Sequence, residues 1–314
     1  MVVTRQADLP VRIGTRGSPL ALAQANEVRT RLLGEVPGVA ERGVEIEVIK
    51  TTGDRVQDRN LSEIGGKGLF TKEIEEALLE RRIDLAVHSL KDMPTVLPDG
   101  LVLAASLPHE DPRDFLLTPE GVTFDDLPQG AVVGTSSLRR RAQALHRRPD
   151  LNIVNFRGNV DTRIGKLEEG VVAATLLARA GLNRLGRNDV TGVVLSVDEF
   201  LPAVCQGIVT IECRADDAEV RAVVAQLSDA AAQWAAEAER GLLAELDGSC
   251  RTPIAGHAVC ESDSVWLRGL VLAPDGSQAF AGERRGAVQD AARLGHDLGK
   301  ELLASAGHIL EALR

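Results

Sequence analysis

Polar and basic residues gather in one segment where a β-rich stretch runs into a helical pattern. The segment GTSSLRRR (Gly134–Arg141) carries three hydroxyls followed at once by arginines. Hydroxyls and free N–H groups at a helix N-terminus bind carboxylates or phosphates, and guanidinium groups bind them in bidentate fashion. The segment therefore indicates an anion site, with an ordinary N-cap followed by surface arginines as an equal alternative. Its candidate residues are Thr135, Ser136, Ser137, Arg139 and Arg140.

Further arginines follow other β-rich stretches of the chain. Arg157 and Arg163 lie in FRGNVDTR, Arg184 follows AGL, and Arg16 follows VRIGT beside Ser18. Ligands of open α/β sheets bind outside the carboxyl ends of the strands, so we expect these side chains to converge. The window from Arg139 to Arg187 holds ten Arg and one Lys against two Asp and two Glu, a net +7, although the whole chain carries −10. This pattern predicts a local polyanion site and argues against a broad nucleic-acid-binding or membrane-binding surface.

An acidic residue stands at another predicted strand end. AVHSLKDMP places Lys91 and Asp92 directly after a β-rich run. A carboxylate a few Å from a developing cation stabilises that cation. Asp92 is therefore a candidate catalytic group, and an aspartate that caps the turn before Pro94 is the alternative. The segment GGKGLF lacks the GxxxxGK[ST] pattern, so we expect Lys67 on a flap or on the wall of the site.

A single cysteine lies among small residues in AELDGSCRTPIAG. Those neighbours leave Cys250 open to approach, and a small buried thiol is the alternative. The other cysteines, Cys205, Cys213 and Cys260, form no CxxC pair with it, and the six histidines show no HxxxH or HExxH spacing. We therefore expect neither a disulfide framework nor a metal site.

These residues need an α/β framework to position them. Short β-rich runs alternate with helical patterns through the first two thirds of the chain, which is typical of βαβ units on mostly parallel sheets. The runs form two sets of similar size, which predicts two lobes with a cleft between them. An alanine-rich helix from Asp229 to about Leu246, a hairpin at PDGS and a final helix at 288–306 predict a small α+β domain. A first helix is predicted from Ser18-Pro19 to about Leu33, and Gly34 is expected to end it. A second helix is predicted to end at about Arg81. The predicted strands lie at 11–14, 44–50, 83–89, 131–134, 152–156, 171–177 and 208–213.

The N-terminal sequence has no apolar run long enough for a secretory signal, and no stretch reaches the roughly 20 apolar residues of a membrane span. We expect a soluble, cytoplasmic protein. Aromatic residues make up 3% of the chain and tyrosine is absent, so aliphatic side chains must fill the cores.

Taken together, the motifs resemble the porphobilinogen deaminase family. The resemblance runs in consistent order through VRIGTRGSPLALAQ, TTGD, GGKGLFTKE, DLAVHSLKDMPT, EDPRDF, GTSSLRR, RGNVDTR, AGLNRLG, LPAVCQG and ERGLLAELDGSCRTPI. It implies two lobes like those of periplasmic binding proteins and a small C-terminal α+β domain. The implied boundaries are 1–107 with 208–226 for lobe 1, 108–207 for lobe 2, and 227–314 for the C-terminal domain.

The resemblance also implies an activity and a cofactor. Members of the family join four porphobilinogen molecules head to tail, with loss of ammonia, and release the linear tetrapyrrole hydroxymethylbilane. The tetrapyrrole grows on a dipyrromethane primer, of which each protein carries one. Cys250 would hold this primer through a thioether. Asp92 would be the acid/base and would also contact the cofactor. Lys91, Arg139, Arg140, Thr135, Ser136 and Ser137 would bind the cofactor, and Arg16, Ser18, Arg157, Arg163, Arg184, Gln206 and Lys67 would bind substrate.

Some positions depart from the family pattern. Cys205 stands where glycine is usual and would add a second thiol near the cleft, which could mislead thiol labelling. Glu63 replaces a frequently basic residue, and Arg251 follows the anchor cysteine. Family precedent predicts a monomer, with transient hand-over of product to uroporphyrinogen-III synthase. A non-catalytic, two-lobed small-anion-binding protein is the alternative from another class, and a nucleic-acid binder is a third.

Overall fold

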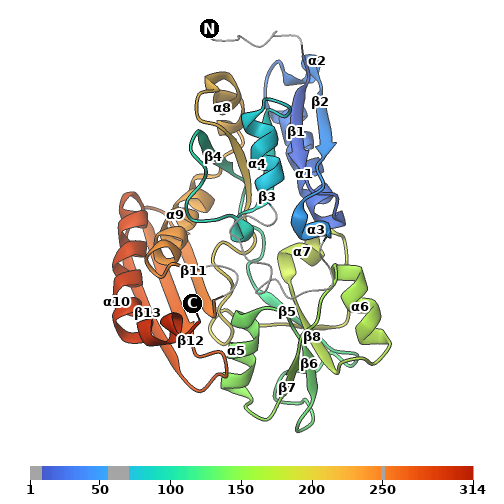
Figure 1. Cartoon of the computed structure of the whole chain (residues 1–314), viewed down its shortest axis with the longest axis vertical. Helices are drawn as coiled ribbons and strands as arrows, with labels where there is room; N and C mark the ends of the chain where they lie inside the picture. Colours follow the sequence, from blue (N-terminus) through green and yellow to red (C-terminus); the bar gives the residue numbers. More distant parts are fainter. Residues whose placement is uncertain (1–8, 56–70, 249–251, 314) are drawn as a thin grey trace. The chain divides into compact units, whose positions relative to one another are not determined.

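A computed structural model describes residues 9–55, 71–248 and 252–313 of the chain. The chain divides into two compact units, one of residues 1–108 and 208–233 and the other of residues 109–207 and 234–314. In this division the predicted C-terminal domain shares a unit with the predicted second lobe, and the three-domain boundaries stay a prediction. Figure 1 shows each sheet with its own helices.

The first unit is built on a five-stranded sheet in the order β2-β1-β3-β10-β4. β1, β2 and β3 run parallel, and β10 pairs antiparallel with both β3 and β4. The strands are β1 (Val11–Thr15), β2 (Val44–Val48), β3 (Leu85–Ser89), β4 (Leu101–Ser106) and β10 (Val209–Arg214). The helices are α1 (Pro19–Glu35), α2 (Val39–Arg42), α3 (Thr52–Arg55), α4 (Lys72–Leu79) and α8 (Ala218–Ala225), with a 3₁₀ turn, η1 (Leu90–Asp92).

Helix α1 begins as its sequence predicts. The Ser18 hydroxyl accepts a hydrogen bond from Ala21 N at 3.3 Å, and Pro19 occupies the first helical position. The buried residues Ala25, Val28 and Leu32 follow helical spacing and pack into the core shared with β1, β3 and β10. Gly34 does not end the helix, contrary to the sequence prediction, because the last turn continues to Glu35 and closes with the Val36 N–H on the Leu32 carbonyl.

The second unit contains a sheet of the same strand arrangement, in the order β7-β6-β8-β5-β9. β6 is parallel to β7 and β8, while β5 is antiparallel to β8 and β9. Its strands are β5 (Asp114–Leu117), β6 (Val132–Gly134), β7 (Asn152–Val154), β8 (Ala174–Ala178) and β9 (Gly192–Val194). Its helices are α5 (Leu138–Arg147), α6 (Val160–Glu168) and α7 (Arg179–Arg184).

An antiparallel sheet and a long helix complete the second unit. The strands β11 (Ile254–Glu261), β12 (Ser264–Leu272) and β13 (Ala279–Ala287) form a meander, and Gly276 takes the positive φ of 76° that the PDGS turn requires. Helix α10 (Ala291–Glu311) follows a 3₁₀ turn, η2 (Val288–Asp290), and packs on β12 and β13. Helix α9 (Ala230–Glu245) starts at the predicted cap, where Asp229 Oδ1 accepts from Ala232 N at 2.8 Å.

These elements confirm the predicted α/β class: two sheets of mostly parallel strands, each with its own helices, and a small α+β portion at the C-terminal end. The sequence analysis did not predict β5, which places the short run DFLL between β8 and β9 in a sheet. The predicted strand at 171–177 lies at 174–178. Among the described residues, no helix is both long enough and apolar enough to cross a membrane.

Candidate active site

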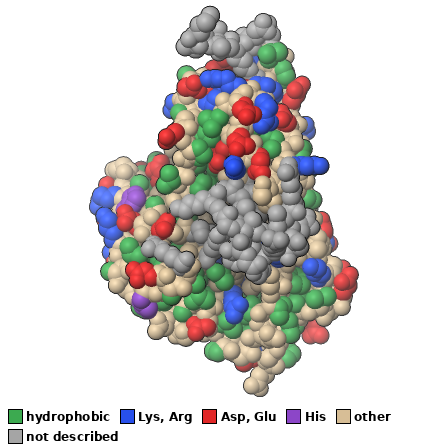
Figure 2. Space-filling model, viewed as in Figure 1, with side chains coloured by type: hydrophobic (Ala, Val, Ile, Leu, Met, Phe, Trp, Pro, Cys, Tyr) green, Lys and Arg blue, Asp and Glu red, His purple; other side chains and the backbone are tan. Residues whose placement is uncertain are grey.

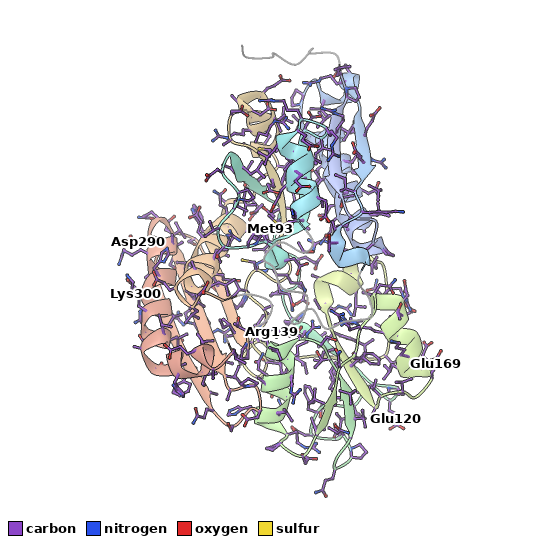
Figure 3. All side chains as sticks on the ribbon, viewed as in Figure 1. Met93, Glu120, Arg139, Glu169, Asp290 and Lys300 are labelled. Carbon is purple, nitrogen blue, oxygen red and sulfur yellow. The ribbon has the colours of Figure 1, made fainter. Side chains whose placement is uncertain are left out.

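Asp92 lies in the first unit at the carboxyl end of β3. The strand passes into the η1 turn, which closes with Met93 N donating to the Leu90 carbonyl at 3.1 Å. Leu90 is buried and its N–H donates to Ile208 O at 2.9 Å, so the turn is fixed to the adjoining chain. Asp92 itself is exposed, directly before the labelled Met93 in Figure 3. The fold thus holds the backbone of Asp92 while leaving its carboxylate accessible.

A small pocket of about 70 Å³ opens beside Asp92. Arg16 and Ser18, from the loop between β1 and α1, line it together with Asp92, as the strand-exit argument predicts. Gln24 also lines the pocket, and its Nε2 donates to the Ser89 hydroxyl at 2.8 Å. The sequence analysis missed Gln24, although its place one turn and a half into the helix after Ser18 faces the same strand end. The other lining residues are Leu20, Ala21, Thr71, Val87 and His88.

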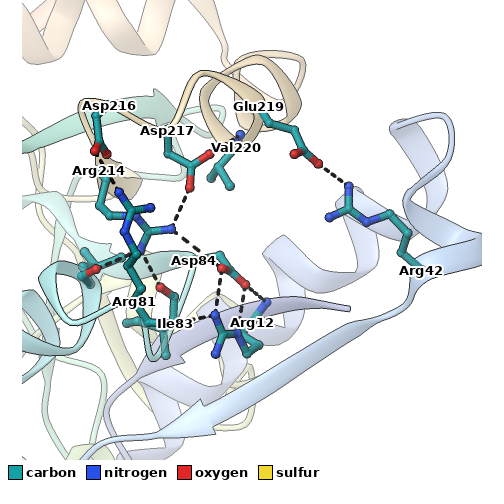
Figure 4. A network of polar contacts seen from close by, with 11 residues as sticks. Arg12, Arg42, Arg81, Ile83, Asp84, Arg214, Asp216, Asp217, Glu219 and Val220 are labelled. Carbon is teal, nitrogen blue, oxygen red and sulfur yellow. Dashed lines mark hydrogen bonds and ion pairs between the residues drawn. The ribbon is translucent and has the colours of Figure 1, made fainter. Parts of the chain in front are cut away.

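An ion-pair network fixes the opposite end of β3 (Figure 4). The buried Asp84 carboxylate accepts from Arg12 N at 2.8 Å, and Arg12 Nη2 donates to its second oxygen at 3.1 Å. Arg214 of β10 lies 3.8 Å from Asp84 and pairs with Asp217 at 2.6 Å. These contacts join β1, β3 and β10 in one register, and this register sets where the strand ends and the Asp92 turn begins.

The anion segment of the second unit is a helix start, as predicted. Ser137 is the N-cap of α5 and its hydroxyl accepts from Arg140 N at 3.4 Å, while the Thr135 hydroxyl accepts from Ser137 N at 3.2 Å. The Ser136 hydroxyl donates to Phe156 O at 2.9 Å and accepts from Phe156 N at 3.1 Å. The three hydroxyls therefore shape the loop. Thr135 is buried, Ser137 is half-buried and Ser136 is exposed.

Arg139 and Arg140 point inward from α5 onto Asp114, the first residue of β5 (Arg139 is labelled in Figure 3). Arg139 Nη1 donates to Asp114 Oδ2 at 2.6 Å, and Arg140 Nη2 donates to Oδ1 at 2.7 Å. Gln206 Nε2 also donates to Oδ1, at 3.0 Å. Burial alone would raise the pKa of the Asp114 carboxyl, but the two arginines hold it well below its ordinary value.

This arrangement gives Arg139, Arg140 and Gln206 an internal partner that the sequence analysis did not foresee. All three side chains are buried, and both Arg140 Nη groups are engaged by the protein, Nη1 on the Leu176 carbonyl at 2.8 Å. The motif EDPRDF, in which Asp114 precedes an apolar run, could have indicated a buried carboxylate. The sequence analysis used this motif only as part of the family resemblance. The predicted cofactor-binding role of these residues stays a prediction.

Arg163 belongs to a cluster of positive charge. Its Nε donates to Gly158 O at 3.0 Å. Burial, together with the charges of Arg140 and Arg157, lowers the pKa of the Arg163 guanidinium to about 10. A cationic cluster of this kind favours binding of an anionic ligand, because the ligand would relieve the repulsion among the guanidinium groups.

Arg184 ends α7 and donates through both Nη1 and Nη2 to Gly207 O at 3.1 Å. Gly207 has a φ of +102°, and a Cβ there would lie 2.4 Å from Glu110 O, so the position excludes other residues. Lys91 is half-buried in the η1 turn. Cys250 and Lys67 lie outside the described residues, as do Glu63 and Arg251.

Cys205 does not behave as predicted. Its side chain is buried, at 1% exposure, and burial raises the pKa of its thiol well above the ordinary value. The expectation that Cys205 would mislead thiol labelling is therefore wrong. Its φ of +60° lies in the left-handed region, which explains why glycine suits this position. Cys213, expected in a core strand, is buried in β10.

Comparison with known proteins accounts for nearly the whole chain. The family model described as "Porphobilinogen deaminase, dipyromethane cofactor binding domain" matches residues 11–222, and "Porphobilinogen deaminase, C-terminal domain" matches residues 234–304. A porphobilinogen deaminase of Paracoccus denitrificans is 57% identical over 293 residues, covering 93% of each chain. The chloroplastic porphobilinogen deaminase of Pisum sativum is 51% identical over 302 residues, covering 95% of this chain and 82% of the relative.

A solved structure of a putative periplasmic sulfonate-binding protein from Methylobacillus flagellatus is 17% identical, covers 77% of this chain and 74% of its own, and has a TM-score of 0.43. The Paracoccus denitrificans and Pisum sativum relatives are more than 50% identical to this chain over the aligned residues, and each alignment covers more than nine tenths of it. Both of them are named porphobilinogen deaminase. The chain belongs to the porphobilinogen deaminase family.

Proposed function

We propose that Asp92 is the acid/base of this enzyme and that the arginines of the second unit bind the carboxylates of its cofactor and substrate. The reaction itself follows from the family: the chain joins four porphobilinogen molecules head to tail, with loss of ammonia, into hydroxymethylbilane for tetrapyrrole biosynthesis. The family's cofactor is dipyrromethane. The observation that carries the proposal is the position of Asp92 in a pocket that also contains Arg16 and Ser18.

The residues of the second unit fit a carboxylate-rich cofactor. Each pyrrole of dipyrromethane carries an acetate and a propionate, so the group is a polyanion. The lowered pKa of Arg163, caused by burial and by Arg140 and Arg157, shows a cluster of positive charge that such a group would neutralise. Family precedent assigns the covalent link to Cys250 and adds Lys91, Arg139, Arg140 and the hydroxyls of residues 135–137. When bound, the cofactor supplies the pyrrole carbon to which the first porphobilinogen is added.

Asp92 has the features that the reaction asks of an acid/base. Its carboxylate is exposed at the pocket, while the η1 turn and the buried Leu90 hold its backbone. As an acid it would protonate the departing amine, and as a base it would accept a proton from a pyrrole carbon. As a carboxylate it would stabilise the cation that forms when ammonia leaves. Arg16 and Ser18 would bind a substrate carboxylate beside it, and Arg157, Arg163, Arg184, Gln206 and Lys67 would contribute further contacts.

The alternatives explain less. A non-catalytic anion-binding protein would use the arginines but would leave Asp92 and Cys250 without a role. The relatives described above are more than 50% identical to this chain and are named porphobilinogen deaminases. A nucleic-acid binder needs a continuous basic surface. On the face in Figure 2, blue and red side chains are interspersed among the residues drawn in colour. The proposal extends to a cytoplasmic monomer that hands its product to uroporphyrinogen-III synthase.

Intact mass tests the covalent part of the proposal. We expect freshly purified protein to exceed its calculated mass by two linked pyrrole units, and the Cys250→Ser variant to show no excess. The Cys260→Ser variant is the matched control and should keep the added mass. If the wild-type chain shows no added mass even after incubation with porphobilinogen, the cofactor assignment fails.

A further inference from the structure

A buried group of titratable side chains lies behind the pocket that Asp92 lines. His88 belongs to β3, and its Nε2 lies 3.1 Å from Glu212 Oε2 of the neighbouring strand β10. Their side chains are 5% and 0% exposed. Glu75 of α4 is also buried, and the charges of both His88 and Glu212 act on its carboxyl. The established reaction, as described above, assigns no role to any of the three.

His88 connects this group to the pocket. It is one of the pocket-lining residues, four positions before Asp92 in the chain. Because Glu212 occupies Nε2, the ring has only Nδ1 left for exchange with the pocket. Neutral imidazole carries its proton on the nitrogen that faces a carboxylate, so Glu212 fixes the tautomer with hydrogen on Nε2 and a lone pair on Nδ1.

Both carboxyl groups of the cluster are buried. Glu75 Oε1 and Glu212 Oε1 are both buried, and neither has a hydrogen-bond partner in the described part of the chain. Burial raises the pKa of the Glu75 carboxyl, against the lowering effect of the Thr71 hydroxyl, and the charge of Glu212 raises it further. Burial and Glu212 both favour the uncharged form of Glu75, and Glu212 is the carboxyl in contact with His88.

We propose that Glu212 and His88 form a proton store for Asp92, in which Glu212 fixes the His88 tautomer and His88 Nδ1 exchanges a proton with the pocket. His88 and Glu212 are positioning residues in this scheme, since they act through Asp92, and the proposal rests on the acid/base role proposed for that residue. Each addition delivers one proton to the departing amine and takes one from a pyrrole carbon, so the protons balance without a co-reactant. After the pyrrole carbon has lost its proton to Asp92, the Asp92 O–H passes that proton to Nδ1, Glu212 holds the resulting imidazolium, and the imidazolium returns the proton to Asp92 before the next amine departs.

The charged and titratable groups around His88 define what a test must separate. They are Glu212 from β10, Glu75 from α4, and Arg16 and Asp92 along the pocket. Glu212→Gln keeps the side-chain shape and removes the charge that stabilises the imidazolium. Glu75→Gln replaces a carboxyl whose uncharged form is favoured by burial, so it is the matched control, also buried and equally conservative.

The experiment measures the pH profile of kcat/KM for porphobilinogen with the holoenzymes. For Glu212→Gln we expect a loss of roughly tenfold and an acidic limb moved to lower pH by about one unit, because His88 then releases its proton more readily. For Glu75→Gln we expect a profile within about twofold of wild type at every pH. An unchanged Glu212→Gln profile, or an equal displacement in both variants, overturns the proposal.

A readout independent of turnover is ¹⁵N NMR of histidine-labelled protein, with His88→Asn identifying the His88 signal. We expect an Nε2–H tautomer in wild type and in Glu75→Gln, and a mixture of tautomers in Glu212→Gln. An Nδ1–H tautomer in wild type would contradict the proposal even where a variant folds poorly. If Asp92→Asn keeps its activity while the tautomer results hold, then the role of Asp92 fails and the Glu212–His88 arrangement stands.

Discussion

The carboxylate of Asp114 lies 2.6 Å from Arg139 and 2.7 Å from Arg140, and all three side chains are less than one tenth exposed. Asp114 is the first residue of β5, and both arginines lie in the first turn of α5. The ion pairs therefore join β5 to the helix that carries the predicted anion site. Two guanidinium groups share one carboxylate, which leaves a net positive charge at this position. The arrangement therefore orients both arginines.

Asp114→Asn should destabilise the protein by about 3–5 kcal/mol, since it leaves two buried guanidinium groups without their counter-charge. Chemical denaturation of the full-length protein measures this loss in the free energy of unfolding. Asp125→Asn is the control, because Asp125 pairs with Arg147 at a side-chain exposure of 62%, and its removal should leave the unfolding midpoint unchanged. A variant at position 114 that is as stable as this control contradicts the assignment.

The same ion pair predicts a pH dependence of stability. The pKa of Asp114 is held below its ordinary value in the folded state, so the unfolded chain binds more protons as the pH falls. The stabilisation should be complete above the unfolded pKa of about 4 and should be lost progressively at lower pH. Denaturation of wild type between neutral pH and acid should therefore show a falling free energy of unfolding, with a smaller slope in Asp114→Asn. Parallel curves would show that other carboxyls dominate.

Asp92→Asn should fold normally and lose turnover by roughly 10²–10⁴-fold, because an amide cannot exchange protons with the substrate. The side chain is exposed, so its replacement costs little stability. The rate of porphobilinogen consumption and the thermal midpoint are measured together. The control is Asp99→Asn, an exposed aspartate of the same unit that does not line the pocket. Near-wild-type turnover in Asp92→Asn would remove this residue from the mechanism.

The strand-exit argument predicted where Asp92 and Arg16 would lie, because local patterns define the ends of β1 and β3. It could not predict the contacts of Arg139 and Arg140, whose partner Asp114 is 25 and 26 residues earlier and comes from an antiparallel strand. Burial of a side chain depends on such distant pairings, which periodicity along one segment does not encode. For the same reason the contact between His88 and Glu212 carried no recognisable signal. Sequence therefore identified the site's exposed members better than the buried groups that support them.

Arg163→Met should weaken porphobilinogen binding by tenfold or more without lowering the stability of the cofactor-free protein. Burial and the neighbouring arginines lower the pKa of Arg163, so its charge is unfavourable in the folded state, and losing it offsets the lost hydrogen bond to Gly158. The comparison is Arg163→Lys, which retains a charge and should retain more affinity. Binding is followed by tryptophan fluorescence and stability by urea denaturation. Loss of stability with unchanged affinity would assign Arg163 a structural role.

Cys205→Gly should leave the free energy of unfolding within about 1 kcal/mol of wild type, since relief of the left-handed backbone offsets the lost packing of a small buried side chain. Cys205→Val should cost more than 2 kcal/mol, because a β-branched residue fits poorly at a φ of +60°. Urea denaturation of both variants measures the difference. In native protein, the buried Cys205 should also resist thiol reagents that label the unfolded chain. If Val were tolerated as well as Gly, backbone strain would not govern which residues suit this position.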